Sequence, residues 1–419
     1  MRIAMPSNAF LPHGRAGTEH YLGELVPALA DLGHEDEIRA EVWHTLPVSS
    51  HAEAYAITRG THQGVANTAV TVPAHALDSP RNPRMRRVAR ELLAELRPDV
   101  MHVHNLRGLS LSVLDAAREA GLPLLLTCHD FWFLCPTAIL IQGGGAACTG
   151  PEDAAKCAAC LRMDHELHGR PGSPPGLAAV RARAAAFAEA FAAMDLVLYP
   201  SEFSRRIHAA WLPAPRRAVV SPLGMRPIER RDRPASGETL RLAYLGGVTH
   251  FKGLDVALDA LLELGPDAPV TLDIHGTANN PDYLAAMLDA ARGRPGIVHH
   301  GGYAKADLPD ILAGADAVVL PSRVESYSFV AREALSAGVP VIASDAGALP
   351  EAVRHQADGL IFPSEDHHAL AACIRRLLDG RGQDRGLLER LREGIRPVRG
   401  IEDDAAALAE RYARLAGRV

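Results

Sequence analysis

The chain of 419 residues is long for a single hydrophobic core, so its length predicts two domains. Its 44 lysines and arginines stand against 50 aspartates and glutamates, and this net charge of −6 argues against a protein that binds nucleic acid through a basic surface. The N-terminus lacks the apolar core of a secretion signal, and no run of eighteen apolar residues predicts a membrane span. We therefore expect a cytoplasmic protein with small-molecule partners.

Short apolar runs alternate with segments of helical period, which predicts repeated βα units. In the first half the predicted strands are Arg2–Met5, Val100–Val103, Leu122–Thr127, Leu196–Tyr199 and Ala218–Ser221. The alternation restarts in the second half with LRLAYLG, VTLDIHG, GIVHHGG, DAVVLPS and VPVIAS.

This pattern predicts an α/β protein with two Rossmann-like, doubly wound domains. The expected boundaries are an N-terminal domain at 1–225, an Arg- and Pro-rich linker at 226–239, a C-terminal domain at 240–400 and a closing helix at 401–419. The helical period of the last segment does not tell which domain it packs on.

The stretch PSRVESYSFVAREAL places Glu325 in a loop after an apolar strand and Glu333 in the helix that follows. Ser326 or Ser328 is expected to cap this helix, whose first backbone N–H groups, near residues 327–330, suit phosphate oxygens. Eight residues of helical rise span about 12 Å, so the two carboxylates are expected to bind a sugar and a ribose on either side of a diphosphate.

The longer stretch PSRVESYSFVAREALSAGVPVIASDAGALPEAV resembles the donor-site motif of retaining glycosyltransferases of family 4. Members of this family have the GT-B fold, in which two Rossmann-like domains face a cleft. The resemblance implies that Glu325 contacts sugar hydroxyls and that Glu333 binds the ribose. It also implies that the backbone amides of Tyr327, Ser328 and Phe329 line the donor. The family usually has Gly-Phe-Gly where this chain has Ser326-Tyr327-Ser328, so the identity of the donor sugar stays open.

The turn LGGVTHFKG carries Lys252, a point charge beside a plausible phosphate-binding turn. In the family this turn usually holds an arginine and a lysine that neutralise the leaving diphosphate. Lys252 matches the lysine, whereas Gly247 stands at the arginine position. Arg323 and His250 are the candidates to replace the missing charge, because diphosphate departure needs positive charge.

Three further glycine-containing turns complete the expected donor site. The resemblance places the nucleotide base near Gly276 and Tyr303. Gly17 resembles the glycine of the family loop whose backbone approaches the donor phosphate, and Glu19 matches the acidic position that follows it.

Polar residues that follow two strands of the first half form the expected acceptor side. His129 and Asp130 come after the strand LLLT, and His104 and Asn105 end the preceding strand. The resemblance implies that His129 approaches the donor sugar, while a hydrogen-bonded structural His-Asp pair is the alternative. Trp132 is either an acceptor contact or part of a packed wall.

Four of the six cysteines, Cys135, Cys148, Cys157 and Cys160, fall close together in the loop 135–160. One CxxC with two nearby thiols suits a structural tetrahedral zinc site, with unrelated buried thiols as the alternative.

The resulting hypothesis is a retaining glycosyltransferase with catalytic residues His129, Glu325 and Lys252. It would use a nucleoside diphosphate sugar as co-substrate, a small-molecule acceptor and no catalytic cofactor. A nucleotide-sugar epimerase or hydrolase and a non-catalytic nucleotide-sugar-binding module are the alternatives, and a homo-oligomer is compatible with the sequence.

Overall fold

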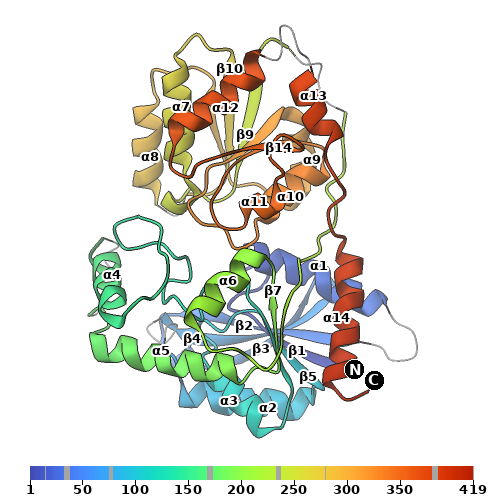
Figure 1. Cartoon of the computed structure of the whole chain (residues 1–419). Coiled ribbons are helices and arrows are strands. Elements are labelled where there is room, and N and C mark those ends of the chain that lie inside the picture. The colour runs from blue at the N-terminus through green and yellow to red at the C-terminus, as the bar shows by residue number, and fades with distance from the viewer. Residues whose placement is uncertain are drawn as a thin grey trace. The chain divides into compact units, whose positions relative to one another are not determined.

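The computed structural model describes residues 1–14, 16–32, 38–74, 79–167, 173–232, 237–278, 280–379 and 386–418. The chain divides into two compact units, one of residues 1–226 together with 399–419, and the other of residues 227–398. Both are parallel-dominated α/β sheets covered by helices, as predicted (Figure 1). Of the helices in the described ranges, none is both long enough and apolar enough to cross a membrane.

The sheet of the first unit has the strand order β3-β4-β2-β1-β5-β6-β7-β8. Its strands are β1 (Arg2–Pro6), β2 (Arg39–Val48), β3 (Ile57–His62), β4 (Val65–Pro73), β5 (Val100–Val103), β6 (Leu124–Thr127), β7 (Leu196–Tyr199) and β8 (Ala218–Val220). All neighbours pair in parallel except β3 and β4, which form an antiparallel hairpin at one edge. The order reverses between β1 and β5, which is where open α/β sheets usually bind ligands.

The helices of the first unit are α1 (Gly17–Asp31), α2 (Pro83–Leu96), α3 (Ser112–Glu119), α4 (Ala154–Leu167), α5 (Leu177–Ala192), α6 (Glu202–Trp211) and α14 (Ile401–Leu415), with a short 3-10 helix η1 (His51–Glu53). The C-terminal helix α14 packs beside α1 in this unit (Figure 1, red and blue). Helix α4 and the loop before it stand out to one side of the sheet (Figure 1).

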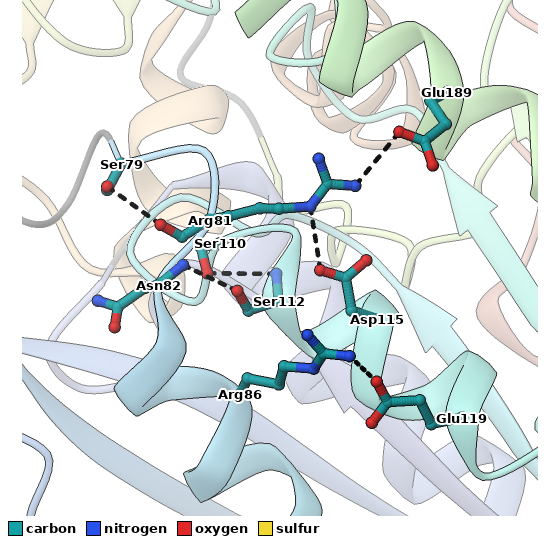
Figure 2. A network of polar contacts seen from close by, with 9 residues as sticks. All are labelled: Ser79, Arg81, Asn82, Arg86, Ser110, Ser112, Asp115, Glu119 and Glu189. Carbon is teal, nitrogen blue, oxygen red and sulfur yellow. Dashed lines mark hydrogen bonds and ion pairs between the residues drawn. The ribbon is translucent and has the colours of Figure 1, made fainter. Parts of the chain in front are cut away.

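A polar network holds α2, α3 and α5 together (Figure 2). The Asn82 side chain caps α2 by accepting from two backbone N–H groups, and its own backbone N–H donates to Ser112 Oγ at 2.8 Å. Arg81 reaches Asp115 at 3.1 Å and Glu189 at 3.5 Å, and Arg86 pairs with Glu119. Because the arginines are more than a third exposed, these pairs orient the helices more than they stabilise them.

The sheet of the second unit has the order β11-β10-β9-β12-β13-β14, with all neighbours parallel. Its strands are β9 (Leu240–Leu245), β10 (Val270–His275), β11 (Ile297–Gly301), β12 (Ala317–Leu320), β13 (Val341–Ser344) and β14 (Gly359–Phe362). Its helices are α7 (Leu254–Leu264), α8 (Pro281–Ala290), α9 (Leu308–Gly314), α10 (Phe329–Ser336), α11 (Leu349–Ala352), α12 (His367–Asp379) and α13 (Gly386–Glu393), with 3-10 helices η3 (His250–Lys252) and η4 (Lys305–Asp307). Here the order reverses between β9 and β12.

The segment expected as a linker belongs in part to the second unit. Ile228 is buried, its backbone N–H donates to Ser336 Oγ at 3.0 Å, and Arg230 donates to the Ser336 carbonyl at 3.1 Å. Residues 233–236 of this segment lie outside the described residues. Residues 227–232 therefore belong to the second unit, where Ile228 and Arg230 are held by hydrogen bonds to Ser336.

Candidate functional site

The carboxyl ends of β9 and β12 bring Lys252 and Glu325 together. Lys252 ends η3, the turn after β9, and Glu325 lies in the loop after β12. The Nζ atom of Lys252 donates to Glu325 Oε1 at 2.6 Å, and Ser322 Oγ donates to the same oxygen at 3.0 Å. Because β9 and β12 are the two strands at which the sheet order reverses, this pair lies where the topology predicts a ligand.

Lys252, Glu325 and Ser322 line a hollow of about 210 Å³, which Tyr244 and Val330 also border. Only eight of the described residues border it, so this hollow suits one end of a ligand rather than a whole nucleotide sugar. Its walls offer a carboxylate that accepts hydrogen bonds from hydroxyls and an ammonium that attracts an anion.

The loop between Glu325 and helix α10 is not built as the sequence predicted. Ser328 occupies the N-cap position, but its side chain makes no capping hydrogen bond, so the predicted serine cap is wrong for this residue. Ser328 has φ +60°, a left-handed conformation that glycine adopts freely and other residues rarely do. Its Oγ atom is buried and has no hydrogen-bond partner among the described residues.

The remaining loop side chains pack inward or lie at the loop surface. Tyr327 is buried, and the guanidinium of Arg332 stacks 3.6 Å from the centre of its ring. Arg332 also donates to the carbonyl oxygens of Tyr327 and Ser328, which fixes the loop from inside. Ser326 and Phe329 are half-buried. No sequence pattern indicated Arg332, which lies in a helix of ordinary composition.

Glu333 lies in the second turn of α10 and is 9% exposed. Only residues 329–333 between the two glutamates are helical, so the predicted 12 Å of continuous helical rise does not apply. Lys305, in η4 after β11, lies 3.7 Å from Glu333 Oε1, and it was not predicted. Burial and then the charge of Glu333 raise the pKa of Tyr303.

Arg323 does not offer a free positive charge. Its guanidinium donates to both carboxylate oxygens of Asp255, at 3.0 and 2.6 Å, and its Nε donates to Glu365 at 2.9 Å. The residue is only 7% exposed. Two carboxylates already neutralise the guanidinium, so Arg323 fixes η3 and α7 to the β12 loop and is a poor replacement for the missing arginine.

Two neighbouring glycines after β9 and one after β10 differ sharply in the space around them. A Cβ atom on Gly276 would lie 1.8 Å from the carbonyl oxygen of Gly246, whereas one on Gly247 would meet nothing closer than 3.9 Å. Gly246 itself has φ +124°. Close approach of the two turns therefore requires glycine at 276 but not at 247.

In the first unit the carboxyl end of β6 carries His129 and Asp130, and that of β5 carries His104 and Asn105. His104 Nδ1 and His129 Nε2 are hydrogen-bonded at 2.8 Å, and Asn105 Nδ2 donates to Asp130 at 2.5 Å. Burial lowers the pKa of His129 to about 3 and raises that of Asp130 to about 6. The predicted residues thus form two pairs between adjacent strands, His104 with His129 and Asn105 with Asp130, rather than a His-Asp pair.

Residues of α1 and α14 surround this group, and sequence reasoning missed them. Tyr21 lies with its ring 5.4 Å from that of His129 and donates to Asp404 at 2.9 Å. Tyr412 is hydrogen-bonded to His102 Nδ1 at 2.6 Å. The residues of the first contact are 383 positions apart in the chain and those of the second are 310 apart, so no local sequence pattern indicates either contact.

Two further residues, Gly17 and Trp132, lie in surroundings that differ from those expected from the sequence. Gly17 is the first residue of α1 and not part of the preceding loop, while Glu19 accepts from the Ala16 backbone at 2.7 Å. Trp132 is 3% exposed, packs edge-on against Phe187 and stacks with Arg183. Trp132 is therefore part of the packed wall.

Family models match both halves of the chain. The model described as Glycosyltransferase Family 4 matches residues 15–227, and that described as Glycosyl transferases group 1 matches residues 239–380. The D-inositol 3-phosphate glycosyltransferase of Jonesia denitrificans is 35% identical over 185 residues, 41% of this chain and 43% of that protein. The glycogen synthase of Mycobacterium tuberculosis is 35% identical over 148 residues, 35% of this chain and 36% of that protein. The chain thus matches less than half the length of these curated relatives.

Two solved structures share the fold over nearly all of both chains. Sucrose-phosphate synthase from Thermosynechococcus elongatus has a TM-score of 0.73 at 17% identity and covers 100% of each chain. HepE from Anabaena, in complex with UDP and glucose, has a TM-score of 0.67 at 16% identity and covers 98% of this chain and 99% of its own. At these identities the likeness establishes a GT-B fold.

Proposed function

Because the chain belongs to glycosyltransferase family 4, we propose that it transfers a sugar, with retention, from a nucleoside diphosphate sugar to a small-molecule acceptor. The observation that carries this proposal is the Lys252–Glu325 pair at the point where the strand order of the second unit reverses. Similar proteins such as HepE, whose structure holds UDP and glucose, are consistent with a nucleotide-sugar donor.

The donor is proposed to lie along the carboxyl ends of β9, β10 and β12. Glu325 would accept hydrogen bonds from sugar hydroxyls, and Lys252 would attract the diphosphate. The buried, unpartnered hydroxyl of Ser328, at the start of α10, is placed to hydrogen-bond a phosphate oxygen there. This position is also favoured by the positive end of the helix dipole.

The nucleoside is proposed to lie toward β11. Glu333 would accept from ribose hydroxyls, with Lys305 at 3.7 Å balancing its charge. Tyr303, whose pKa the charge of Glu333 helps to raise, and the glycine turn at Gly276 would border the base.

The proposed reaction is a front-side displacement. The bond between the anomeric carbon and the phosphate oxygen breaks, and an acceptor hydroxyl forms the new bond on the same face of the sugar. The acceptor proton passes to the departing phosphate oxygen. Lys252 and the start of α10 would stabilise the charge that develops on the diphosphate, so the proposed chemistry uses no metal ion.

His129 is proposed to orient the reacting sugar from the first unit. Because burial holds its pKa at about 3, the ring is neutral near pH 7 and can donate or accept a hydrogen bond without adding charge. Asp130 and Asn105, hydrogen-bonded to each other, are the proposed acceptor-side polar groups.

The test is a screen of nucleoside diphosphate sugars for release of nucleoside diphosphate with and without pooled hydroxyl acceptors. The expected result is acceptor-dependent release and, by NMR of the product, retention of the donor's anomeric configuration. Release that does not need an acceptor would instead indicate a hydrolase. Binding of the donor without release or conversion would indicate a binding module, and conversion of the donor sugar would indicate an epimerase.

A further inference from the structure

Four cysteine side chains line one hollow in the first unit, beside helix α4. The hollow measures about 400 Å³ and is bordered by Cys135, Cys148, Cys157 and Cys160. Apolar side chains make up much of the rest of its wall, including Leu134, Leu140, Ile141 and Leu161. The other two cysteines, Cys128 and Cys373, do not line it. Four thiols in a single largely apolar enclosure make an unusual donor set for a surface loop.

The backbone around the hollow presents these thiols from a hairpin and a helix. Residues 141 and 147 form an antiparallel bridge, and the Cys148 N–H donates to the Leu140 carbonyl at 2.8 Å, which places Cys148 at the hairpin's end. Cys157 and Cys160 lie at i and i+3 near the start of α4, so their side chains share one face of the helix. The thiols of the hairpin and of the helix therefore line the same hollow.

Tight packing fixes the positions of the hairpin and α4. A Cβ atom on Gly143 would lie 2.6 Å from the Cys160 carbonyl oxygen, so the hairpin can approach the helix this closely only with glycine. At the other end, a Cβ on Gly150 would lie 2.0 Å from Trp211 Nε1, and that nitrogen donates to the Thr149 carbonyl at 3.1 Å. The packing thus holds the hairpin and α4 in place independently of any ligand.

Polar groups around the thiols suit a negatively charged centre. The Gly143 N–H donates to Cys160 Sγ at 3.2 Å, a bond that thiolate sulfur accepts better than a thiol does. Lys156 also borders the hollow, where its ammonium donates to the Gly150 carbonyl at 3.2 Å and to Glu152 at 2.8 Å. Four thiolates and a divalent ion carry a net charge of −2, which amide N–H groups such as that of Gly143 would offset in part.

We infer that Cys135, Cys148, Cys157 and Cys160 bind one zinc ion as a structural tetrathiolate site. Zinc prefers four thiolate ligands in a tetrahedron with Zn–S bonds of about 2.3 Å, which sets sulfur–sulfur distances of about 3.8 Å. Among the described residues, no three cysteine sulfurs lie within 4.8 Å of one another. The thiols must therefore turn about their Cα–Cβ bonds toward a common centre when the ion binds.

A filled site would fix the loop that starts at the acceptor-side residues. The Cys135 N–H donates to the Phe131 carbonyl at 2.7 Å, and the Trp132 N–H donates to Asp130 Oδ1 at 2.8 Å. The backbone thus runs from Asp130 to the first proposed ligand within a single hydrogen-bonded turn. Since all four ligand positions are taken by cysteine, the ion has no open position for substrate and its role is structural.

The experiment measures metal in the full chain purified without a histidine tag from zinc-supplemented culture. The expected content is about one zinc per chain by elemental mass spectrometry. The Cys157→Ser/Cys160→Ser variant should lose nearly all of this zinc, while Cys373→Ser, the same change at a cysteine outside the hollow, should keep it. Zinc removal with a strong chelator should lower the midpoint of thermal unfolding, and added zinc should restore it.

A cobalt exchange keeps the test decisive if the double variant does not fold. Native chain reconstituted with Co²⁺ should show the visible absorption of tetrahedral thiolate coordination. Zinc content far below one per chain, iron with acid-labile sulfide, or disulfides in place of free thiols would each overturn the inference. So would zinc retained in full by the double variant. Each readout is independent of transfer activity, so the site and the proposed function can fail separately.

Discussion

Lys252 Nζ lies 2.6 Å from Glu325 Oε1, and the two residues come from loops that follow adjacent parallel strands. Glu325 is 8% exposed, and its Oε1 atom accepts from this ammonium and from the Ser322 hydroxyl. A second ion pair, Arg241 with Asp316 at 3.1 Å, links the amino ends of the same two strands. The Lys252–Glu325 pair thus lines a hollow at the carboxyl ends of β9 and β12, whereas the Arg241–Asp316 pair joins their amino ends.

The first prediction compares these two pairs. Lys252→Ala should lower kcat/KM about 10²–10³-fold, because it removes charge stabilisation of the leaving diphosphate. Arg241→Ala should lower the free energy of unfolding by about 1–3 kcal/mol and leave kcat/KM within about twofold, because Asp316 is buried but remote from the hollow. Steady-state kinetics and urea unfolding of both variants check this. Equal loss of activity in the two would contradict the assignment of Lys252.

The second prediction concerns the strained serine before α10. Ser328→Gly should stabilise the chain by up to about 1 kcal/mol, because glycine adopts φ +60° without strain. Ser328→Ala removes the same hydroxyl but keeps the strain. If the Oγ atom binds a donor phosphate, both variants should weaken nucleotide binding several-fold by calorimetry. Unchanged affinity in both would show that the hydroxyl does not contact the donor.

The third prediction rests on the glycine turns after β9 and β10. Gly276→Ala should disrupt nucleotide binding and destabilise the unit, because the new methyl would collide with the Gly246 carbonyl. Gly247→Ala should be close to neutral, within about 0.5 kcal/mol, because its Cβ would meet only ordinary contacts. Thermal unfolding with and without nucleoside diphosphate measures both effects. A large loss in Gly247→Ala would show a backbone requirement at that position.

The open space at Gly247 leads to a fourth prediction. Gly247→Arg should fold normally and raise kcat, because the guanidinium would add positive charge where the leaving diphosphate is proposed to lie. Gly247→Glu, which puts a negative charge at the same position, is the control and should lower kcat. A decrease in kcat in both variants would place the diphosphate elsewhere.

The fifth prediction is the acid sensitivity of the first unit. His129 has a folded pKa of about 3 against 6.5 when unfolded, so below pH 6.5 the unfolded chain binds more protons and stability falls as pH falls toward 3. Asp130 acts in the opposite sense, because its folded pKa of about 6 exceeds the unfolded 3.8, so its contribution is lost as pH rises from 4 to 6.

Variants at these two positions separate the contributions. His129→Asn should make the free energy of unfolding, measured by urea at pH 5 and pH 7, less dependent on pH, by about 2 kcal/mol over that interval. Asp130→Asn should make the fall in stability toward acid steeper. If the first variant does not flatten the dependence, His129 is not neutral in the folded chain near pH 5.

Sequence patterns predicted the second unit best, because its strands are short apolar runs followed by glycine, proline or serine. LRLAYL forms a mostly buried strand and VTLDIH a strand in which every second residue is buried, both with bounds close to those expected. The edge of the first sheet was missed, since β3 is largely exposed and β2 mixes buried and exposed residues without strict alternation. The short strand β14 was also missed, because four apolar residues alone give little signal.

Within the candidate site, sequence located the residues but not their partners. Lys252 and Glu325 are 73 positions apart and meet only because β9 and β12 are neighbours in the sheet. Arg323 was expected as a free charge, but its neutralisation depends on Asp255 and Glu365, which come from two other segments. Positive φ at Ser328 is equally invisible in a sequence, because serine at that position predicts a cap.

The return of α14 to the first unit makes that unit discontinuous along the chain. Its interior includes Tyr412, which is fully buried, and Asp404, which accepts from both Tyr21 and the Gly224 backbone. A fragment ending at residue 226 would therefore expose the apolar surface of α1 and leave His102 without its tyrosine partner. An autonomous version of this half would have to join residue 399 onward to residue 226 by a designed connection, whereas residues 227–398 form one uninterrupted segment that can be excised directly.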